Sequence, residues 1–162
     1  MKNLFIGAAI AFGLAAMAAP AFTADNATAT ASANIVTPVS VTKTQDLVFG
    51  NVLAGTGGTV TVGTTDNRSS TGGVTLLSGA TPRSASFSVV ADTIGGATYQ
   101  MNYSKVDLTG PGAPMVLSGI TPSVSGSLSG NRTIAVGATI TVASAQTPGA
   151  YSGSITATAT YE

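Results

Sequence analysis

Residues 131–143 read NRTIAVGATITVA, and the pattern of this segment indicates the fold class. Every second residue is aliphatic, while Thr, Ala or Gly occupies the positions between them. A period of two residues places one face of a β-strand against a core. We predict a strand here in which Gly137 is a candidate for a β-bulge. Its inward face consists of Ile134, Val136, Ala138, Ile140 and Val142.

The same alternation recurs on both sides of this stretch. Residues 27–35, 58–63, 84–91, 97–104 and 148–162 each carry apolar side chains on one parity. Segments rich in Gly, Pro or Ser separate these runs, which is the pattern of a sandwich or barrel built from short strands. The predicted turns cover residues 53–59, 62–73, 92–97, 109–114 and 125–131. No sustained period of 3.6 residues follows the first 26 residues, so the sequence predicts an all-β domain.

Composition excludes several classes of function. Only 7% of the residues are charged, six cations balance six anions, and the chain contains no His, Cys or Trp. A nucleic-acid partner would require a basic surface that six scattered cations do not provide. Acid-base catalysis would have to use the Asp residues at turn-like segments, and soft-metal binding would lack its ligands. We therefore expect no catalysis and no cofactor. The Asp residues considered are Asp46, Asp66, Asp92 and Asp107.

The first 21 residues have the features of a secretory signal peptide. Lys2 precedes an uncharged apolar run, which ends in Ala-Pro-Ala at residues 19–21. We expect cleavage after Ala21, or as late as Ala24, and no membrane insertion of the mature chain. The predicted organisation is a signal peptide over residues 1–21, an N-terminal extension over 22–36 and one β-domain over 37–162. Without Cys, the exported domain must be stabilised by burial and strand pairing alone.

The extension cannot be ordered by its side chains. Fixing about ten residues costs on the order of 10 to 20 kcal/mol of backbone entropy. Burying four Ala methyl groups and one Ile returns only about 5 to 6 kcal/mol. The segment therefore requires a ladder of main-chain hydrogen bonds, either at an edge of its own domain or on another molecule.

Both ends of the chain resemble a known family. Gly149 is the fourteenth residue from the end and Tyr161 is penultimate, with alternating apolar residues between them, which resembles pilin subunits of the chaperone-usher pathway. Residues 28–52, with the Asp-Leu-x-Phe-Gly turn at 46–50, resemble the opening of archaic-type pilins and spore-coat-U-like domains. The elements TVTVG, GGVTLL and GxYSGxxxxxxxY are also similar to a secreted Gram-negative family of unknown function.

The resemblance implies an incomplete immunoglobulin-like antiparallel β-sandwich that a donated strand completes. A periplasmic chaperone would lend a strand first, an outer-membrane usher would assemble the subunits, and neighbouring copies or related subunits would then exchange extensions. The product would be a pilus or fimbria on the cell surface with a role in adhesion or biofilm formation. By carry-over, the donor residues are Ala27, Ala29, Ala31, Ala33 and Ile35. The acceptor edge and chaperone contact would comprise Gly149, Tyr151, Ile155, Ala157, Ala159 and Tyr161.

Two alternatives stay open at this stage. The small Ala side chains are also compatible with a self-complemented domain that carries its own extension. Such a domain would be a secreted binding module for carbohydrate or another cell-surface ligand. A hydrolase is the second alternative, and it would require two of the four Asp residues to converge.

Overall fold

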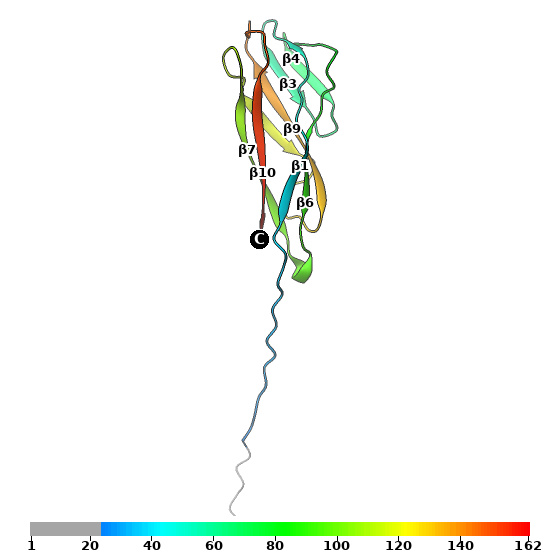
Figure 1. Ribbon diagram of the computed structural model, residues 1–162, viewed down its shortest axis with the longest axis vertical. Helices are drawn as coiled ribbons and strands as arrows, with labels where there is room; N and C mark the ends of the chain where they lie inside the picture. The colour runs from blue at the N-terminus through cyan, green and yellow to red at the C-terminus, as the bar shows by residue number, and fades with distance from the viewer. Residues whose placement is uncertain (1–23) are drawn as a thin grey trace, which may run out of the picture. The chain divides into compact units, whose positions relative to one another are not determined.

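The computed structural model describes residues 24–162, and its regular structure is almost entirely antiparallel β-sheet (Figure 1). The predicted signal peptide, with its cleavage site after Ala21, lies outside the described residues. One short 3₁₀-helix covers Ile94–Gly96. The strands are β1 (Ser40–Gln45), β2 (Val52–Leu53), β3 (Gly58–Val62), β4 (Arg68–Gly72), β5 (Thr75–Leu76), β6 (Ala85–Val90), β7 (Tyr99–Thr109), β8 (Leu117–Pro122), β9 (Arg132–Val142) and β10 (Ser152–Tyr161).

Two sheets form the sandwich. The larger has the order β1-β6-β9-β3-β4, with β8 also paired to β9, and the smaller consists of β7 and β10. Strands β2 and β5 form a separate short ribbon. The arrangement β1-β6-β9-β8 opposite β7-β10 is immunoglobulin-like. The expected all-β antiparallel sandwich is therefore confirmed.

Strand β9 is the centre of the larger sheet, because it has neighbours along its whole length. Its first half pairs with β6 and its second half with β3, while β8 also pairs with it. All five inward residues predicted from the alternation are buried. The bulge expected at Gly137 lies in the partner strand instead: the β8–β9 register shifts between Ser118 and Thr121 of β8, opposite Gly137 and Thr139. Gly137 itself lies where the neighbour changes from β6 to β3, and a Cβ atom at this position would collide with the Val62 carbonyl oxygen.

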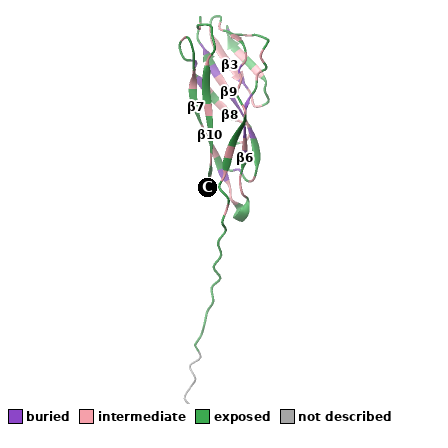
Figure 2. Cartoon of the chain, in the orientation of Figure 1, coloured by how far each residue is buried: buried purple, intermediate pink, exposed green. Residues whose placement is uncertain are grey.

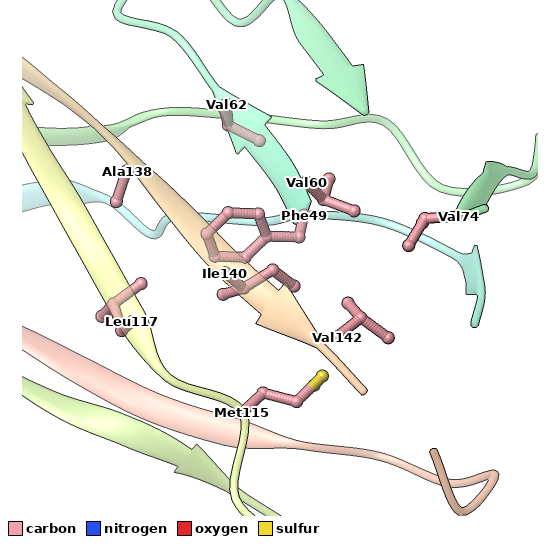
Figure 3. Close-up of a cluster of buried hydrophobic side chains, with 9 residues drawn as sticks. All are labelled: Phe49, Val60, Val62, Val74, Met115, Leu117, Ala138, Ile140 and Val142. Carbon is pink, nitrogen blue, oxygen red and sulfur yellow. The ribbon is translucent and has the colours of Figure 1, made fainter. Parts of the chain in front are cut away.

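The core consists of two clusters between the sheets. One, drawn in Figure 3, gathers around Phe49, Ile140 and Leu117, and the other around Phe87 and Tyr99. In the second cluster, the Phe87 ring of β6 lies 6.5 Å from the Tyr103 ring of β7, which links the two sheets. Figure 2 marks the buried residues of the strands in purple, the intermediate ones in pink and the exposed ones in green.

One predicted turn is wrong. Residues 62–73 contain the strand β4, which pairs with β3 from Gly58↔Gly72 to Val62↔Arg68. Its sequence, RSSTG, has no apolar alternation because β4 is held by its main chain and by polar side chains rather than by burial. The Thr59 and Thr71 hydroxyls lie 2.7 Å apart, and Arg68 donates hydrogen bonds to the Phe49 and Leu77 carbonyl oxygens at 2.7 and 2.8 Å.

Candidate functional site: the free edge of β10

Strand β10 presents one unpaired edge. Within residues 24–162 it pairs with β7 alone, from Ser152↔Thr109 to Tyr161↔Tyr99. The Glu162 N–H donates to the Thr98 carbonyl oxygen at 3.0 Å. Because hydrogen-bonded pairs alternate along an antiparallel ladder, the even-numbered residues of β10 face β7. The backbone N–H and C=O groups of Ile155, Ala157 and Ala159 therefore point to the open edge.

The side chains of these same odd-numbered residues point inward. Ile155, Ala157, Ala159 and Tyr161 pack against the core, yet each is only half-buried. The opposite parity carries Ser154, Thr156, Thr158 and Thr160, all exposed. An apolar face that is half covered and a main-chain edge without a partner coincide on one strand.

Strand β1 borders the opening from the other sheet. It pairs with β6 alone among the described residues, so its second edge is also free. Figure 1 shows β1, in blue, beside β10, in red, and the two strands approach each other without forming a ladder. The open side of the sandwich is therefore the side between β1 and β10.

A cleft of about 1050 Å³ opens onto the core cluster around Phe49, Ile140 and Leu117, at the start of β10. It lies between the segment that follows β1 and the segment that leads into β10. Its apolar wall includes Phe49, Leu108, Met115, Val142 and Ile155. Core side chains are thus reachable from outside at this end of the open edge.

Two of the predicted acceptor residues precede the strand. Gly149 and Tyr151 lie in the loop before β10, which begins at Ser152, so their placement on a strand was wrong. Gly149 has φ 146°, and a Cβ atom there would press on the Pro111 ring at 2.5 Å. The Tyr151 hydroxyl accepts from the Gly112 N–H and donates to the Thr147 carbonyl oxygen. Both residues line the cleft.

Tyr161 lies at the other end of β10, where it contacts the start of the folded domain. Its hydroxyl donates to the Thr37 carbonyl oxygen at 3.0 Å and accepts from the Asp92 N–H at 2.8 Å. The Asp92 carboxylate accepts from the Thr37 N–H at 3.1 Å and from Ile94 N–H at 3.0 Å. These hydrogen bonds, the one from Thr37 first, hold the pKa of Asp92 below its ordinary value.

The N-terminal extension forms no strand within its described part. Residues 24–39 have no strand assignment, and residues 24–35 are exposed. The predicted strand over 27–35 is therefore absent from this structure, since no ladder holds it and its small side chains cannot. The five donor candidates are all exposed, and Ile35 retains 90% of its surface.

Each of the four Asp residues is engaged by partners of its own, those of Asp92 being Thr37 and Ile94. Asp46 pairs with Lys43, Asp66 accepts hydrogen bonds from Ser84, and Asp107 accepts from the Lys105 ammonium and the Leu117 N–H. Across residues 24–162, no group of three or more acidic side chains is placed to hold a metal ion. The part of the chain that the structure describes also contains no helix of the length and apolarity that a membrane crossing requires.

Comparison with known proteins places the domain in a family. Residues 39–161 match the family described as "Domain of unknown function (DUF4402)". The chain belongs to the DUF4402 family. The DUF4402 match begins just after Thr37 and ends on Tyr161, so it coincides with the folded sandwich and excludes the extension. Searches of curated proteins and of solved structures gave no match.

Sequence reasoning missed part of this site in the DUF4402 domain. Thr37 and Asp92 are joined to Tyr161 across 124 and 69 positions of the chain, and no local pattern reports such a contact. Phe49 and Met115 line the cleft but lie outside the alternating runs. The one available signal for Phe49 was its place in the Asp-Leu-x-Phe-Gly turn.

Proposed function

We propose that this protein is a structural subunit of a surface pilus or fibre, polymerised by donor-strand complementation. One observation carries the proposal: the same chain has a half-covered, unpaired edge on β10 and an exposed alternating extension that has no ladder. The edge of β10 lacks a partner strand, and the extension lacks a ladder to pair with. The proposal includes no catalytic step.

The residues of β10 favour pairing of its free edge with another strand. Exposed edge strands are usually protected by Lys, Pro, bulges or short length, because they otherwise recruit other chains. From Ser154 to Tyr161 the strand is uncharged, free of Pro and free of register shifts. Its one irregularity lies between Ser152 and Ser154, at the cleft. An edge of this kind favours β-augmentation by an extended segment.

The extension matches this edge in length and polarity. Nine residues, 27–35, span about 30 Å as a strand, and the ten residues of β10 span about 33 Å. No charge occurs between Asn26 and Thr42. Pairing would bury the Ala side chains beside Ala157 and Ala159 and leave the Thr and Ser side chains of the extension outside.

The cleft favours one direction for the donor. Ile35 is the largest of the five donor residues, and the deep apolar wall lies at the start of β10. A strand antiparallel to β10 brings Ile35 to this wall and the smaller Ala residues to the shallow part. In this direction the donor's own domain lies beyond the Tyr151 end of the acceptor, while the acceptor's extension leaves at the Tyr161 end.

The same edge explains the need for a periplasmic chaperone. A subunit exported with β10 and the cleft uncovered would aggregate, so a transient strand must cover the edge before assembly. We propose that a periplasmic chaperone supplies this strand and that an outer-membrane usher releases it as the next subunit arrives. The signal peptide predicted over residues 1–21 would deliver the chain to that compartment, and the finished fibre would serve adhesion or biofilm formation.

The test is SDS-resistant oligomerisation of chain variants expressed with their export signal. Deleting residues 22–36, or replacing Ile35→Asp, should abolish oligomers that survive mild SDS without heating. Asn34→Asp is the matched control, because it adds the same charge one position away on the opposite parity, and its oligomers should persist.

Persistence of the oligomers after deletion would overturn the donor assignment. A wild-type chain that stays monomeric without any chaperone, with residues 27–35 resistant to protease, would instead favour a self-complemented binding module.

A further inference from the structure

The chain enters the domain through a fixed junction at Thr37. The Thr37 carbonyl oxygen accepts from the Tyr161 hydroxyl at 3.0 Å, and its N–H donates to the Asp92 carboxylate at 3.1 Å. The Thr37 hydroxyl also lies 3.3 Å from the same Asp92 oxygen. Both backbone polar groups of Thr37 are therefore bound to distant parts of the domain, and we call Thr37, Asp92 and Tyr161 the junction clamp.

The partners of Thr37 are themselves held. Tyr161 is half-buried against the core and also accepts from the Asp92 N–H. The second oxygen of the Asp92 carboxylate accepts from the Thr93 and Ile94 N–H groups at 2.7 and 3.0 Å. The clamp thus joins the end of β10, the segment after β6 and the residue that precedes Pro38.

Pro38 limits the junction further. A residue before proline is confined to the extended region, and proline fixes its own φ and lacks an N–H group. A tight reversal between the extension and β1 would need positive-φ residues such as Gly or Asn at its centre. The sequence there is Val36-Thr37-Pro38-Val39, which offers neither.

A barrier to self-pairing is needed if the chain is to polymerise. A segment tethered next to its own groove has an effective concentration on the order of millimolar, so it outcompetes a neighbouring molecule unless geometry forbids the contact. One residue, Val36, separates the last donor residue, Ile35, from the clamp. This spacing leaves little chain with which to bypass a fixed junction.

We infer that the junction clamp keeps the extension out of its own domain's open edge and thereby reserves it for a second copy of the chain. This inference rests on the proposed function. It assigns Tyr161 a positioning role that differs from lining the edge: its hydroxyl holds the junction extended. Loosening the clamp should convert polymerising subunits into self-complemented monomers.

The experiment uses a reporter disulfide, and no native thiol can compete for it because the chain contains no Cys. Ala31 is central in the donor and Ala157 is central among Ile155, Ala157 and Ala159, so the two are adjacent whichever way the donor runs. In the full chain carrying Ala31→Cys and Ala157→Cys, oxidation gives crosslinked multimers when donation is between copies. It gives crosslinked monomers when the strand folds back.

The clamp is then loosened in this reporter. Tyr161→Phe removes the hydroxyl and keeps the ring. Tyr103→Phe is the matched control, because within the described residues its hydroxyl has no hydrogen-bond partner and it lies on β7, outside the proposed acceptor edge. Losing the hydrogen bond to Thr37 should raise the ratio of intramolecular to intermolecular crosslink about two- to tenfold in Tyr161→Phe. Tyr103→Phe should leave the ratio unchanged. A double variant, Thr37→Gly with Pro38→Gly, should raise the ratio further, and it carries the test if Tyr161→Phe does not fold.

The outcomes separate the two proposals. An unchanged ratio in both Tyr161→Phe and the Gly double variant, with multimers still formed, would overturn the clamp and leave strand donation intact. Crosslinked monomers in the unaltered reporter would show that the clamp does not bar self-pairing. Absence of any 31–157 crosslink, together with oligomers that survive deletion of residues 22–36, would reject strand donation itself.

Discussion

Two tyrosines of β7 differ in the hydrogen bonding of their buried hydroxyl groups. Tyr99 is fully buried and donates its hydroxyl to the Gly130 carbonyl oxygen at 3.1 Å. The Tyr103 hydroxyl is also buried, but within the described residues it has no hydrogen-bond partner, and burial raises its pKa. A buried hydroxyl without a partner destabilises the native state, whereas a bonded one contributes to stability.

The two residues make a matched pair of substitutions. Tyr103→Phe keeps the ring contact with Phe87 and removes the unpartnered hydroxyl, so the free energy of unfolding should stay constant or rise by about 1 kcal/mol. Tyr99→Phe should lower it by about 1 kcal/mol, since a made hydrogen bond is lost. Urea denaturation of the two variants measures both changes. A loss of stability in Tyr103→Phe as large as that in Tyr99→Phe would show that the Tyr103 hydroxyl has a partner.

The two edges of β10 differ in hydrogen bonding, and the exchange rates of its backbone amides should report this difference. The N–H groups of Thr156, Thr158 and Thr160 face β7, whereas those of Ala157 and Ala159 face the open edge. In a monomeric subunit the two Ala amides should exchange with solvent much faster than the three Thr amides. Hydrogen exchange followed by NMR gives the rates residue by residue.

Assembly provides the second half of this prediction. When a strand pairs with β10, the amides of Ala157 and Ala159 should become protected, while those of the Thr residues change little. Equal protection of both sets in the monomer would mean that the edge is already covered.

Predictability also varies by element. Strands β6 and β9 could be predicted from the alternation because one face of each is buried along the whole length, so each inward position carries an apolar residue. Strand β4 has no such pattern, since it is an edge strand of Ser and Thr residues that is held by main-chain pairing with β3. The extension has the pattern of a strand but lacks the partner that would make it one. Tyr161 was found from its position in the chain, whereas Thr37 and Asp92 became visible as its partners only in the folded structure.

Below about pH 8, the stability of the whole domain should depend on pH only in the acid range. The chain has no His or Cys, so no side chain has an ordinary pKa between 5 and 8. Four carboxylates have pKa values below their ordinary values because hydrogen bonds favour the charged form. The main donor is Ser84 for Asp66, Thr37 for Asp92, Lys105 for Asp107 and Ser127 for Glu162.

The sign follows from these depressed values. A carboxylate whose pKa is lower in the folded state stabilises the fold above its unfolded pKa of about 4, and this contribution disappears as pH falls through the folded value. The melting temperature should therefore be flat from about pH 5 to 8 and decline below about pH 4. Asp66→Asn should melt lower than wild type at pH 7 and show a shallower decline in acid. An Asp66→Asn profile parallel to that of wild type would show that the Ser84 contacts do not depend on this charge.

The short junction at Thr37 also has a mechanical consequence. In a fibre formed by strand donation, tension passes from one domain to the next through Val36 and along the donated strand, in line with the axis of β10. A pull in this direction loads the hydrogen bonds of the ladder in shear, so that they share the force instead of opening one after another. With a single residue between the inserted strand and the anchored Thr37, almost no slack is taken up before this load is felt. Such a filament would be stiff under slow pulling and would fail by whole-strand extraction, and an uncharged ladder would give it the same strength in dilute and concentrated salt.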